Sequence, residues 1–333
     1  MNFSKTGLIF LALILLVTQA KAENFHFFKY QSFGKAFISD IYSSHIKIQS
    51  GFINDLGEHY YKANYKKRPF FEAQMGGDIS LISYYKNFEG GRLKCASVGM
   101  ASFNLLLDAL ETTTSMVINT DYWMGLELRC LLYHHSIEKT GLRNIGLVLV
   151  PLYHESTHVG DEYTIEGLQK SDEFYRVNVS YEAWKLSLII NDPDTLKGNI
   201  LSARIGIQSV WFAKDGYYQY DILETSGQEL LPSQRIFSYW VQLNWRRTQG
   251  LVASKEIHQI NSLEIHNRVK FGYFPDDPER RVWNFNAYLG WEYQSDNERK
   301  VGAYLHAYYG INPHGQFRYI DNFYFLGLAF TVS

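Results

Sequence analysis

The sequence predicts an all-β protein, an antiparallel transmembrane β-barrel of about 10–12 strands. Three observations lead to this prediction. Apolar and polar residues alternate along many segments of the chain, aromatic residues make up 16% of it, and a short apolar export signal precedes the alternating part. Successive side chains of a strand point to opposite faces, and a tilted strand crosses a bilayer in about 9–11 residues.

Residues 1–22 have the three parts of a secretory signal peptide. Lys5 supplies a positive charge, residues 7–17 form an apolar run, and Ala20-Lys-Ala22 matches a small-x-small cleavage site. The run is much shorter than the ~20 residues of a spanning helix, so we predict removal of the signal and an outer-membrane location. Its two lysines take the net charge from −2 to −4. That near balance argues against a nucleic-acid partner.

The exported part divides into two regions. Residues 23–69 mix Ser, Tyr, Phe and Lys without regular alternation, and we interpret them as an N-terminal pre-barrel extension. From residue 70 to residue 333 a two-residue period dominates, without internal repeats, which predicts one barrel domain. Around Glu182 the apolar phase shifts, which predicts a β-bulge or a tight turn.

Alternation is clearest in six segments of strand length. In the last of them, Tyr324, Leu326, Leu328, Phe330 and Val332 share one face. The opposite faces carry charges of both signs, which would pair across a narrow lumen, so we expect a polar and largely filled interior. The strands of a soluble β-sandwich would be shorter, about 5–6 residues. The six segments are Tyr122–Leu132, Leu201–Trp211, Phe237–Trp245, Leu263–Tyr273, Trp283–Tyr293 and Tyr324–Ser333.

The two cysteines leave two alternatives open. Cys95 and Cys130 both fall in strand-like segments. They either form one disulfide in an oxidising periplasm or stay unpaired on their strands.

The densest group of reactive residues is the segment 153–163. On a strand His154 and Ser156 project from one face, and Asp161 or Glu162 beyond a turn would orient the imidazole. This His-x-Ser pair resembles the pair that outer-membrane phospholipases and lipid A deacylases carry on their outer wall. We favour an inward orientation here, because Tyr153 suits an aromatic girdle and the polar residues suit the lumen. There they would form a hydrogen-bond network that anchors an extracellular loop.

A metal site is the third interpretation of this segment. His154, His158, Asp161 and Glu162, with His134 and His135 upstream, are ligand types suited to zinc. The four-residue spacing of His154 and His158 is typical of a helix, however, and on a strand it separates the two residues by about 13 Å. We therefore predict no metal and no cofactor.

The segment His154–Glu162 also resembles the H-x-S-S-H-L-G-D-E signature of a bacterial envelope family of unknown function. Further matches are Ile118–Tyr122, Val177–Glu182 and Gly310–Phe317. The resemblance implies an outer-membrane-associated, β-rich protein and no established activity. In this chain Thr157 and Val159 replace the usual Ser and Leu, and Ser333 ends the chain where many outer-membrane barrels have an aromatic residue.

Two functional hypotheses follow. The first is an envelope barrel of unassigned activity, whose partners are outer-membrane lipid and the barrel-assembly machinery. The alternative is a lipid-acting serine hydrolase with Ser156 as nucleophile, His154 as base, and Asp161 or Glu162 as the orienting carboxylate.

Overall fold

In the computed structural model, the regular elements are almost all strands. The described residues are 25–29, 33–40, 45–54, 69–108, 116–159, 175–212, 217–221, 228–230, 237–252, 255–270, 280–294, 300–317 and 322–332. Among them, no helix is long and apolar enough to cross a bilayer. The elements are β1 (Phe25–Phe27), β2 (Ile46–Ile53), β3 (Pro69–Phe88), β4 (Gly91–Asp108), β5 (Met116–His134), α2 (His135–Glu138), β6 (Ile145–Val159), β7 (Tyr175–Ile190), β8 (Ile200–Phe212), β9 (Tyr217–Asp221), β10 (Gln228–Leu230), β11 (Phe237–Val252), β12 (Lys255–Lys270), β13 (Arg280–Gln294), β14 (Lys300–Gly310), the 3-10 helix η2 (Gly315–Phe317) and β15 (Phe323–Val332).

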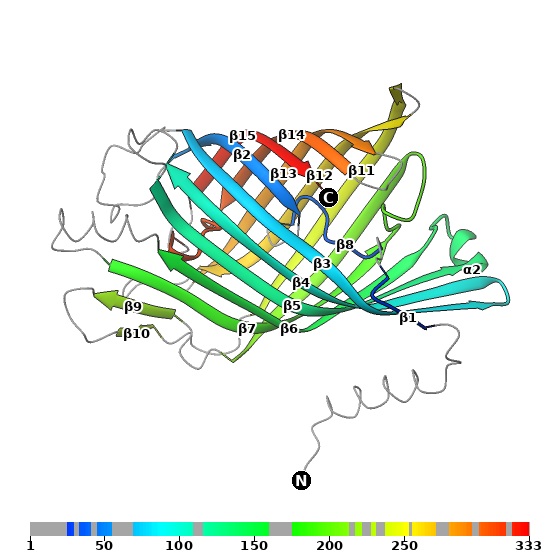
Figure 1. Ribbon diagram of the computed structural model, residues 1–333, viewed down its shortest axis with the longest axis horizontal. Helices are drawn as coiled ribbons and strands as arrows, with labels where there is room; N and C mark the ends of the chain where they lie inside the picture. Colours follow the sequence, from blue (N-terminus) through cyan, green and yellow to red (C-terminus); the bar gives the residue numbers. More distant parts are fainter. Residues whose placement is uncertain are drawn as a thin grey trace, which may run out of the picture.

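Twelve of the strands close into an antiparallel barrel (Figure 1). The ring runs β8, β11, β12, β13, β14, β15, β2, β3, β4, β5, β6, β7 and returns to β8 through the β7–β8 pairing. Closure leaves the barrel without an unpaired edge. β1 pairs with β3, and β9 and β10 extend the sheet from β7. The predicted antiparallel barrel is confirmed.

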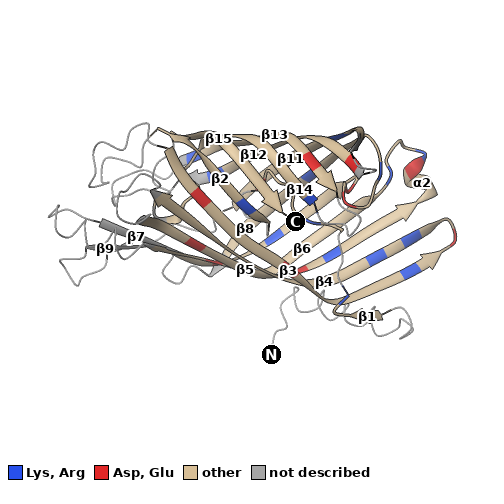
Figure 2. Cartoon of the chain, turned by 45° about the horizontal axis from the view of Figure 1, so that its top comes forward, with Lys and Arg blue, Asp and Glu red and all other residues tan. Residues whose placement is uncertain are grey.

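The two faces of the barrel wall differ as the alternation predicts. On β15, Tyr324, Leu326, Leu328, Phe330 and Val332 point outward, each 43–56% exposed. Charged residues of both signs lie along the strands (Figure 2). In contrast to the outward apolar residues, many polar side chains are buried in the lumen. The wall is therefore built with an apolar outer face and a polar inner face.

The barrel begins earlier in the chain than the sequence predicted. β2 lies between β15 and β3 and joins the last strand to the first part of the barrel. The prediction that residues 23–69 are only a pre-barrel extension is therefore wrong for residues 46–53. Gly51 on β2 lies directly opposite Gly327 on β15. This glycine interrupts the alternation of apolar and polar residues in the sequence of β2.

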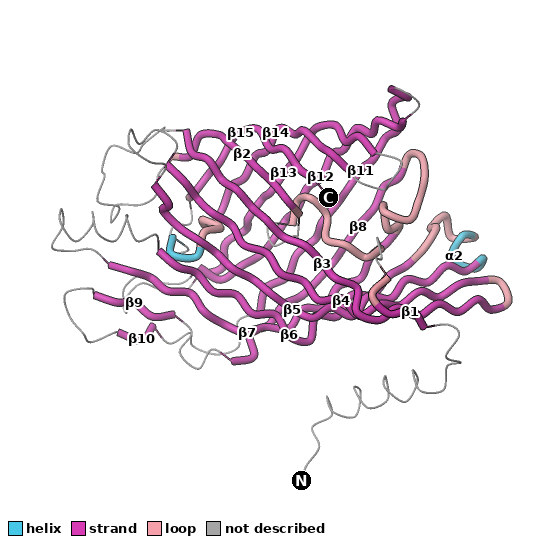
Figure 3. Tube along the Cα trace, viewed as in Figure 1, coloured by secondary structure: helices cyan, strands magenta, loops and turns pink. Residues whose placement is uncertain are grey.

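The segment 33–40 crosses the lumen from one wall to the opposite one. At its start Phe33 is buried in an apolar cluster on β4 and β5. At its end the hydroxyl of Ser39 accepts a hydrogen bond from Ser262 on β12 (2.9 Å), and the Ser39 carbonyl accepts one from Asn286 on β13 (2.6 Å). Figure 3 shows this segment as a loop inside the strands. The extension thus fills part of the barrel.

Opposite charges pair inside the barrel, as the sequence predicted. Arg129, only 2% exposed, donates to Asp78 at 2.8 Å and to Glu127 at 2.6 Å. Lys185 lies 3.4 Å from the centre of the Tyr153 ring. Glu182 lies on the outward face of β7 rather than in the lumen. The register between β7 and β8 shifts at this residue, but the extra residue is in β8 and β7 continues as one strand, so the bulge or turn predicted within β7 itself is not present.

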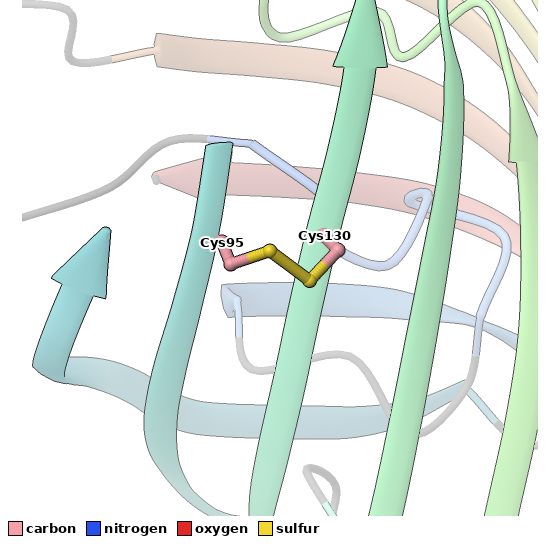
Figure 4. Close-up of a disulfide and its surroundings, with 2 residues drawn as sticks. All are labelled: Cys95 and Cys130. Atoms are coloured by element: carbon pink, nitrogen blue, oxygen red, sulfur yellow. A yellow bond between two sulfur atoms is a disulfide. The ribbon is translucent and has the colours of Figure 1, made fainter. Parts of the chain in front are cut away.

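A disulfide joins β4 to β5. Cys95 and Cys130 lie directly opposite each other in the sheet, with Cα atoms 4.1 Å apart (Figure 4). Of the two alternatives that the sequence left open, the bonded one is present.

Candidate functional site

A β-bulge in β6 decides which face carries the His-x-Ser pair. Between Val150 and Tyr153, β6 has one residue more than each of its neighbours β5 and β7. Pro151 lies in this bulge, where its missing N–H costs no ladder hydrogen bond. Val148 and Val150 point inward before the bulge, and Tyr153 is buried inside the barrel after it. The extra residue therefore reverses the faces of the rest of the strand.

The prediction that His154 and Ser156 face the lumen is therefore wrong. Leu152 is 56% exposed, and His154, Ser156 and His158 follow on the same outer face. The alternation could not reveal this, because residues on both faces of the first half of β6 are apolar. His158 packs edge-on against the Tyr122 ring, 5.5 Å between the ring centres.

The imidazole of His154 meets a carboxylate on the neighbouring strand. His154 and Glu182 are directly opposite in the β6–β7 register, and Nδ1 lies 3.3 Å from Oε1. Ser156 lies opposite Ser180 in the same register. Within the described part of the chain, no hydrogen bond joins Ser156 to His154. Asp161 and Glu162 lie outside the described residues, so their orienting role stays a prediction.

The inward residues of the same segment form a buried polar network. Thr157 donates its hydroxyl hydrogen bond to Asp121 at 2.5 Å and lies 3.1 Å from Asn119 Oδ1. Glu155 accepts from the hydroxyls of Tyr153 (3.2 Å) and Tyr181 (2.5 Å). All six residues are at most 4% exposed. A buried carboxylate needs such donors, because leaving it without them would cost several kcal/mol.

This network holds the loop between β14 and β15. The backbone N–H of Gly315 donates to Asp121 at 2.9 Å. A Cβ atom at Gly315 would lie 2.5 Å from the Thr157 side chain, so only glycine allows this close approach. His314 lies between Glu72 and Asp121, with a ring nitrogen 3.6 Å from an oxygen of each. The loop therefore closes over the lumen beside β5 and β6.

Three of the motif segments therefore meet at one place. Ile118–Tyr122 contributes Asp121, the β6 segment contributes Glu155 and Thr157, and Gly310–Phe317 contributes the loop. The inward residues were not predicted as a site, because the histidines and the serine of β6 are the residue types with recognisable chemistry. The polar residues Glu155 and Thr157, which alternate with the histidines and the serine in the same segment, were the sequence pattern that could have indicated this network. Among the described residues, no group of three or more His, Cys, Asp or Glu is arranged to hold a metal ion.

A second charged cluster lies at the opposite end of the lumen, in the turn between β7 and β8. The backbone N–H of Gly34 donates to Asp192 at 3.1 Å, and Lys300 lies 2.6 Å from Asp194. Burial and the charge of Asp194 raise the pKa of Asp192 to about 7. Burial and the nearby Lys35 lower the pKa of His45 to about 4. This cluster fixes the start of the lumen segment.

The outer wall beside His154 is hollowed by small residues. Gly77, Gly99 and Ala101 on β3 and β4 line a groove of about 1190 Å³, part of it open to the surroundings. Leu152, Met124 and His154 also line this groove. Its exposed lining is mostly apolar, so it suits a hydrocarbon chain better than a polar ligand.

Comparisons with known proteins give similarities of fold. No protein-family model and no curated protein matches the sequence. The β domain of the Bordetella autotransporter BrkA has a TM-score of 0.38 and 10% identity, covering 86% of this chain and 99% of that one. The NalP translocator domain of Neisseria meningitidis has a TM-score of 0.40 and 10% identity, covering 86% and 85%. A Pseudomonas aeruginosa FadL homologue has a TM-score of 0.32 and 9% identity, covering 86% and 87%. The strand pairing itself, rather than these similarities, establishes the barrel.

Proposed function

We propose that this protein is an outer-membrane envelope barrel whose lumen is sealed, so that it does not act as a general diffusion pore. The single observation that carries the proposal is the segment 33–40, which spans the lumen and bonds to opposite walls. Rings of one charge sign around an open lumen are typical of selective pores. Here the interior charges pair with one another instead, as Arg129 does with Asp78 and Glu127.

The far end of the lumen is also obstructed. The loop 311–317 folds against β5 and β6, and its residues Ile311, Asn312 and His314 are at most 2% exposed. A solute would have to displace this loop as well as the segment 33–40. Sealing at two levels favours a role for the wall and the loops of the protein over a role for the lumen.

The proposed location rests on the outer face and on the export signal. The outward belt of Leu, Ile, Phe, Trp and Tyr side chains suits hydrocarbon, and a closed barrel satisfies every backbone hydrogen bond of its strands there. Residues 1–22, which lie outside the described residues, carry the predicted export signal. Outer-membrane lipid and the barrel-assembly machinery are then the expected partners. The resemblance to the envelope family supports the same proposal.

Ion conductance in a planar lipid bilayer tests the sealed lumen. We expect the folded wild-type protein to conduct little, and a variant lacking residues 33–40 to conduct steadily at the same protein amount. Both proteins are first checked for the heat-dependent gel mobility of a folded barrel. Steady wild-type conductance equal to that of the deletion variant would refute the proposal.

A further inference from the structure

We propose that the outer wall of β6 and β7 carries an acyl-ester hydrolase site for a membrane lipid. Ser156 is its nucleophile, His154 is its general base, Glu182 positions the imidazole, and the groove beside His154 holds the acyl chain. The sealed lumen requires none of these features, so this inference goes beyond the proposed function. It replaces Asp161 and Glu162 with Glu182 as the orienting carboxylate.

The carboxylate is placed to select one tautomer of the imidazole. Glu182 Oε1 lies 3.3 Å from Nδ1 of His154, so a proton on Nδ1 is shared with the carboxylate. Nε2 is then the basic nitrogen. The His154 side chain is 33% exposed and the Glu182 side chain 40%, so both are accessible from the outer wall. This pair supplies the base and its orienting group.

Ser156 is the nucleophile that the proposal assigns to this base. It lies two residues beyond His154 on the same outer face, about 6.6 Å along the strand at ~3.3 Å per residue. The length of an imidazole covers much of that distance. The hydrogen bond between nucleophile and base is often long in an unliganded enzyme and shortens when substrate binds. The bulge at Pro151 is what brings both residues to the lipid side.

The groove gives the acyl chain a place beside this pair. Gly77, Ala101, Met124 and His154 follow one another across β3, β4, β5 and β6 in the sheet register. The small residues leave a depression next to Met124, which is 55% exposed. A hydrocarbon chain lying across these strands would therefore end at the imidazole.

The level of the site on the barrel suits the ester group of a lipid. On the side of the long connections, Tyr122 lies opposite Ser156 and packs near Phe103, 6.5 Å between ring centres. Aromatic residues of this kind mark the interface between headgroups and hydrocarbon. On the other side the outer wall continues with Leu152. Lipid ester bonds lie at this boundary, where water also reaches.

The reaction balances without a metal or a redox partner. The Ser156 oxygen attacks the ester carbonyl carbon while its proton passes to Nε2 of His154. The bond from the carbonyl carbon to the alcohol oxygen breaks, and the leaving alcohol takes the proton from His154. Water, activated by the same imidazole, then hydrolyses the acyl-Ser156 ester. The products are a fatty acid and the deacylated lipid.

Labelling with a fluorophosphonate tests the nucleophile directly. We expect the full-length protein, folded in detergent micelles, to be labelled, and Ser156→Ala to lose the label. Loss of the base in His154→Ala should lower the labelling rate by about 10²–10⁴-fold. Ser180→Ala is the matched control, since Ser180 lies on the same outer face one strand away. Absence of label from the wild type, or equal labelling of Ser156→Ala, would overturn the proposal.

Groove filling separates the acyl site from the nucleophile. A Cβ atom at Gly99 has no closer neighbour than 4.0 Å, so Gly99→Leu fits without backbone strain but fills the groove. We expect it to slow hydrolysis of long-chain esters at least tenfold and that of a two-carbon p-nitrophenyl ester much less. Ala307→Leu, at an exposed outward position of β14, is the control. Equal rates for Gly99→Leu and Ala307→Leu on long chains would refute the groove assignment.

Two substrates and one positioning variant complete the test. Mixed micelles with phosphatidylglycerol and micelles of lipopolysaccharide distinguish the two sources of an acyl ester, and hydrolysis of neither refutes the proposal. Glu182→Gln should lower kcat more than it raises KM and move the acidic limb of the pH profile, with rescue by Glu182→Asp. An unchanged pH profile in Glu182→Gln would exclude the positioning role. Bilayer conductance is independent of these readouts, so failure here leaves the sealed lumen in place.

Discussion

Asp121 on β5 accepts a 2.9 Å hydrogen bond from the backbone N–H of Gly315, a residue 194 positions further along the chain. The same carboxylate accepts a bond from Thr157 on the next strand. One buried carboxylate therefore ties the β14–β15 loop to the barrel wall, and its environment can be tested by small changes.

Thr157→Val removes the hydroxyl group that donates a hydrogen bond to Asp121, and it keeps nearly the same side-chain volume. We expect it to lower the free energy of unfolding by about 1–3 kcal/mol, because a buried acceptor loses a donor. Denaturant unfolding in detergent, followed by tryptophan fluorescence, measures the change. Thr157→Ser keeps the hydroxyl and should stay close to the wild type. Equal losses in both variants would mean that the methyl group matters and the hydrogen bond does not.

Arg129→Met leaves Asp78 and Glu127 buried without their shared cation. Breaking a buried ion pair from one side typically costs about 3–5 kcal/mol, so we expect a loss of that order in the same unfolding measurement. Arg247→Met, at an exposed outward position, is the control and should change little. A loss below about 1 kcal/mol for Arg129→Met would show that water or a rearranged side chain compensates the carboxylates.

Gly51→Val disturbs the strand pair that closes the barrel. A Cβ atom at Gly51 would lie 2.4 Å from the Leu326 carbonyl oxygen, so β2 and β15 must separate to admit it. We expect poor assembly, seen as loss of the compact band in an unheated gel sample. Gly77→Val is the comparison, because nothing lies within 4 Å of a Cβ atom there. Normal assembly of Gly51→Val would contradict the tight pairing.

Removing the disulfide should destabilise the barrel without changing its fold. Cys95 and Cys130 enclose a sequence separation of 35 residues, for which chain entropy gives at most about 4 kcal/mol. The Cys95→Ala/Cys130→Ala variant, measured with and without reductant, isolates this term, since only the wild type should respond to reductant. A wild type that ignores reductant would show that the bond does not contribute.

Docking of the segment 33–40 should depend on pH through two opposed groups. The pKa of Asp192 is raised to about 7 from 3.8, so its contribution to docking weakens as pH rises between these values. The pKa of His45 is lowered to about 4 from 6.5, so its contribution weakens as pH falls between them. The two pH ranges overlap from about pH 4 to 6.5, where a rise in pH weakens the contribution of Asp192 to docking and strengthens that of His45.

Single variants should separate the two contributions. We expect Asp192→Asn to loosen the segment on acidification and His45→Gln to loosen it on alkalinisation towards pH 7. The mobility of a nitroxide attached at position 36 reports the docking, and Asp194, Lys35 and Lys300 remain in both variants. The same pH response in both variants would contradict the assignment.

The barrel was predictable because each strand with a regular alternation has one apolar face. Phe237, Trp283 and Leu326 all lie outward as the alternation requires. Alternation carries the information only where the two faces differ in polarity. β2 was missed because Ser50 and Gly51 interrupt its pattern, although Ile46 and Ile48 alternate with polar residues.

The candidate site was less predictable, for a local reason. In the first half of β6 both faces are apolar, so the phase could not be followed through Pro151 to His154. The pairing of His154 with Glu182 depends on the register of two strands, which no single-strand pattern contains. The path of residues 33–40 through the lumen depends on contacts with Ser262 and Asn286, more than 200 positions away.

Lipid accessibility along β6 tests most directly whether the bulge turns the His-x-Ser pair outward. Nitroxides are placed singly at positions 154, 155 and 156 of the protein in lipid vesicles, and their collision rates with oxygen are compared with those for a water-soluble nickel complex. We expect high oxygen accessibility at 154 and 156 and low accessibility at 155. High accessibility at 155 with protection at 154 and 156 would contradict it.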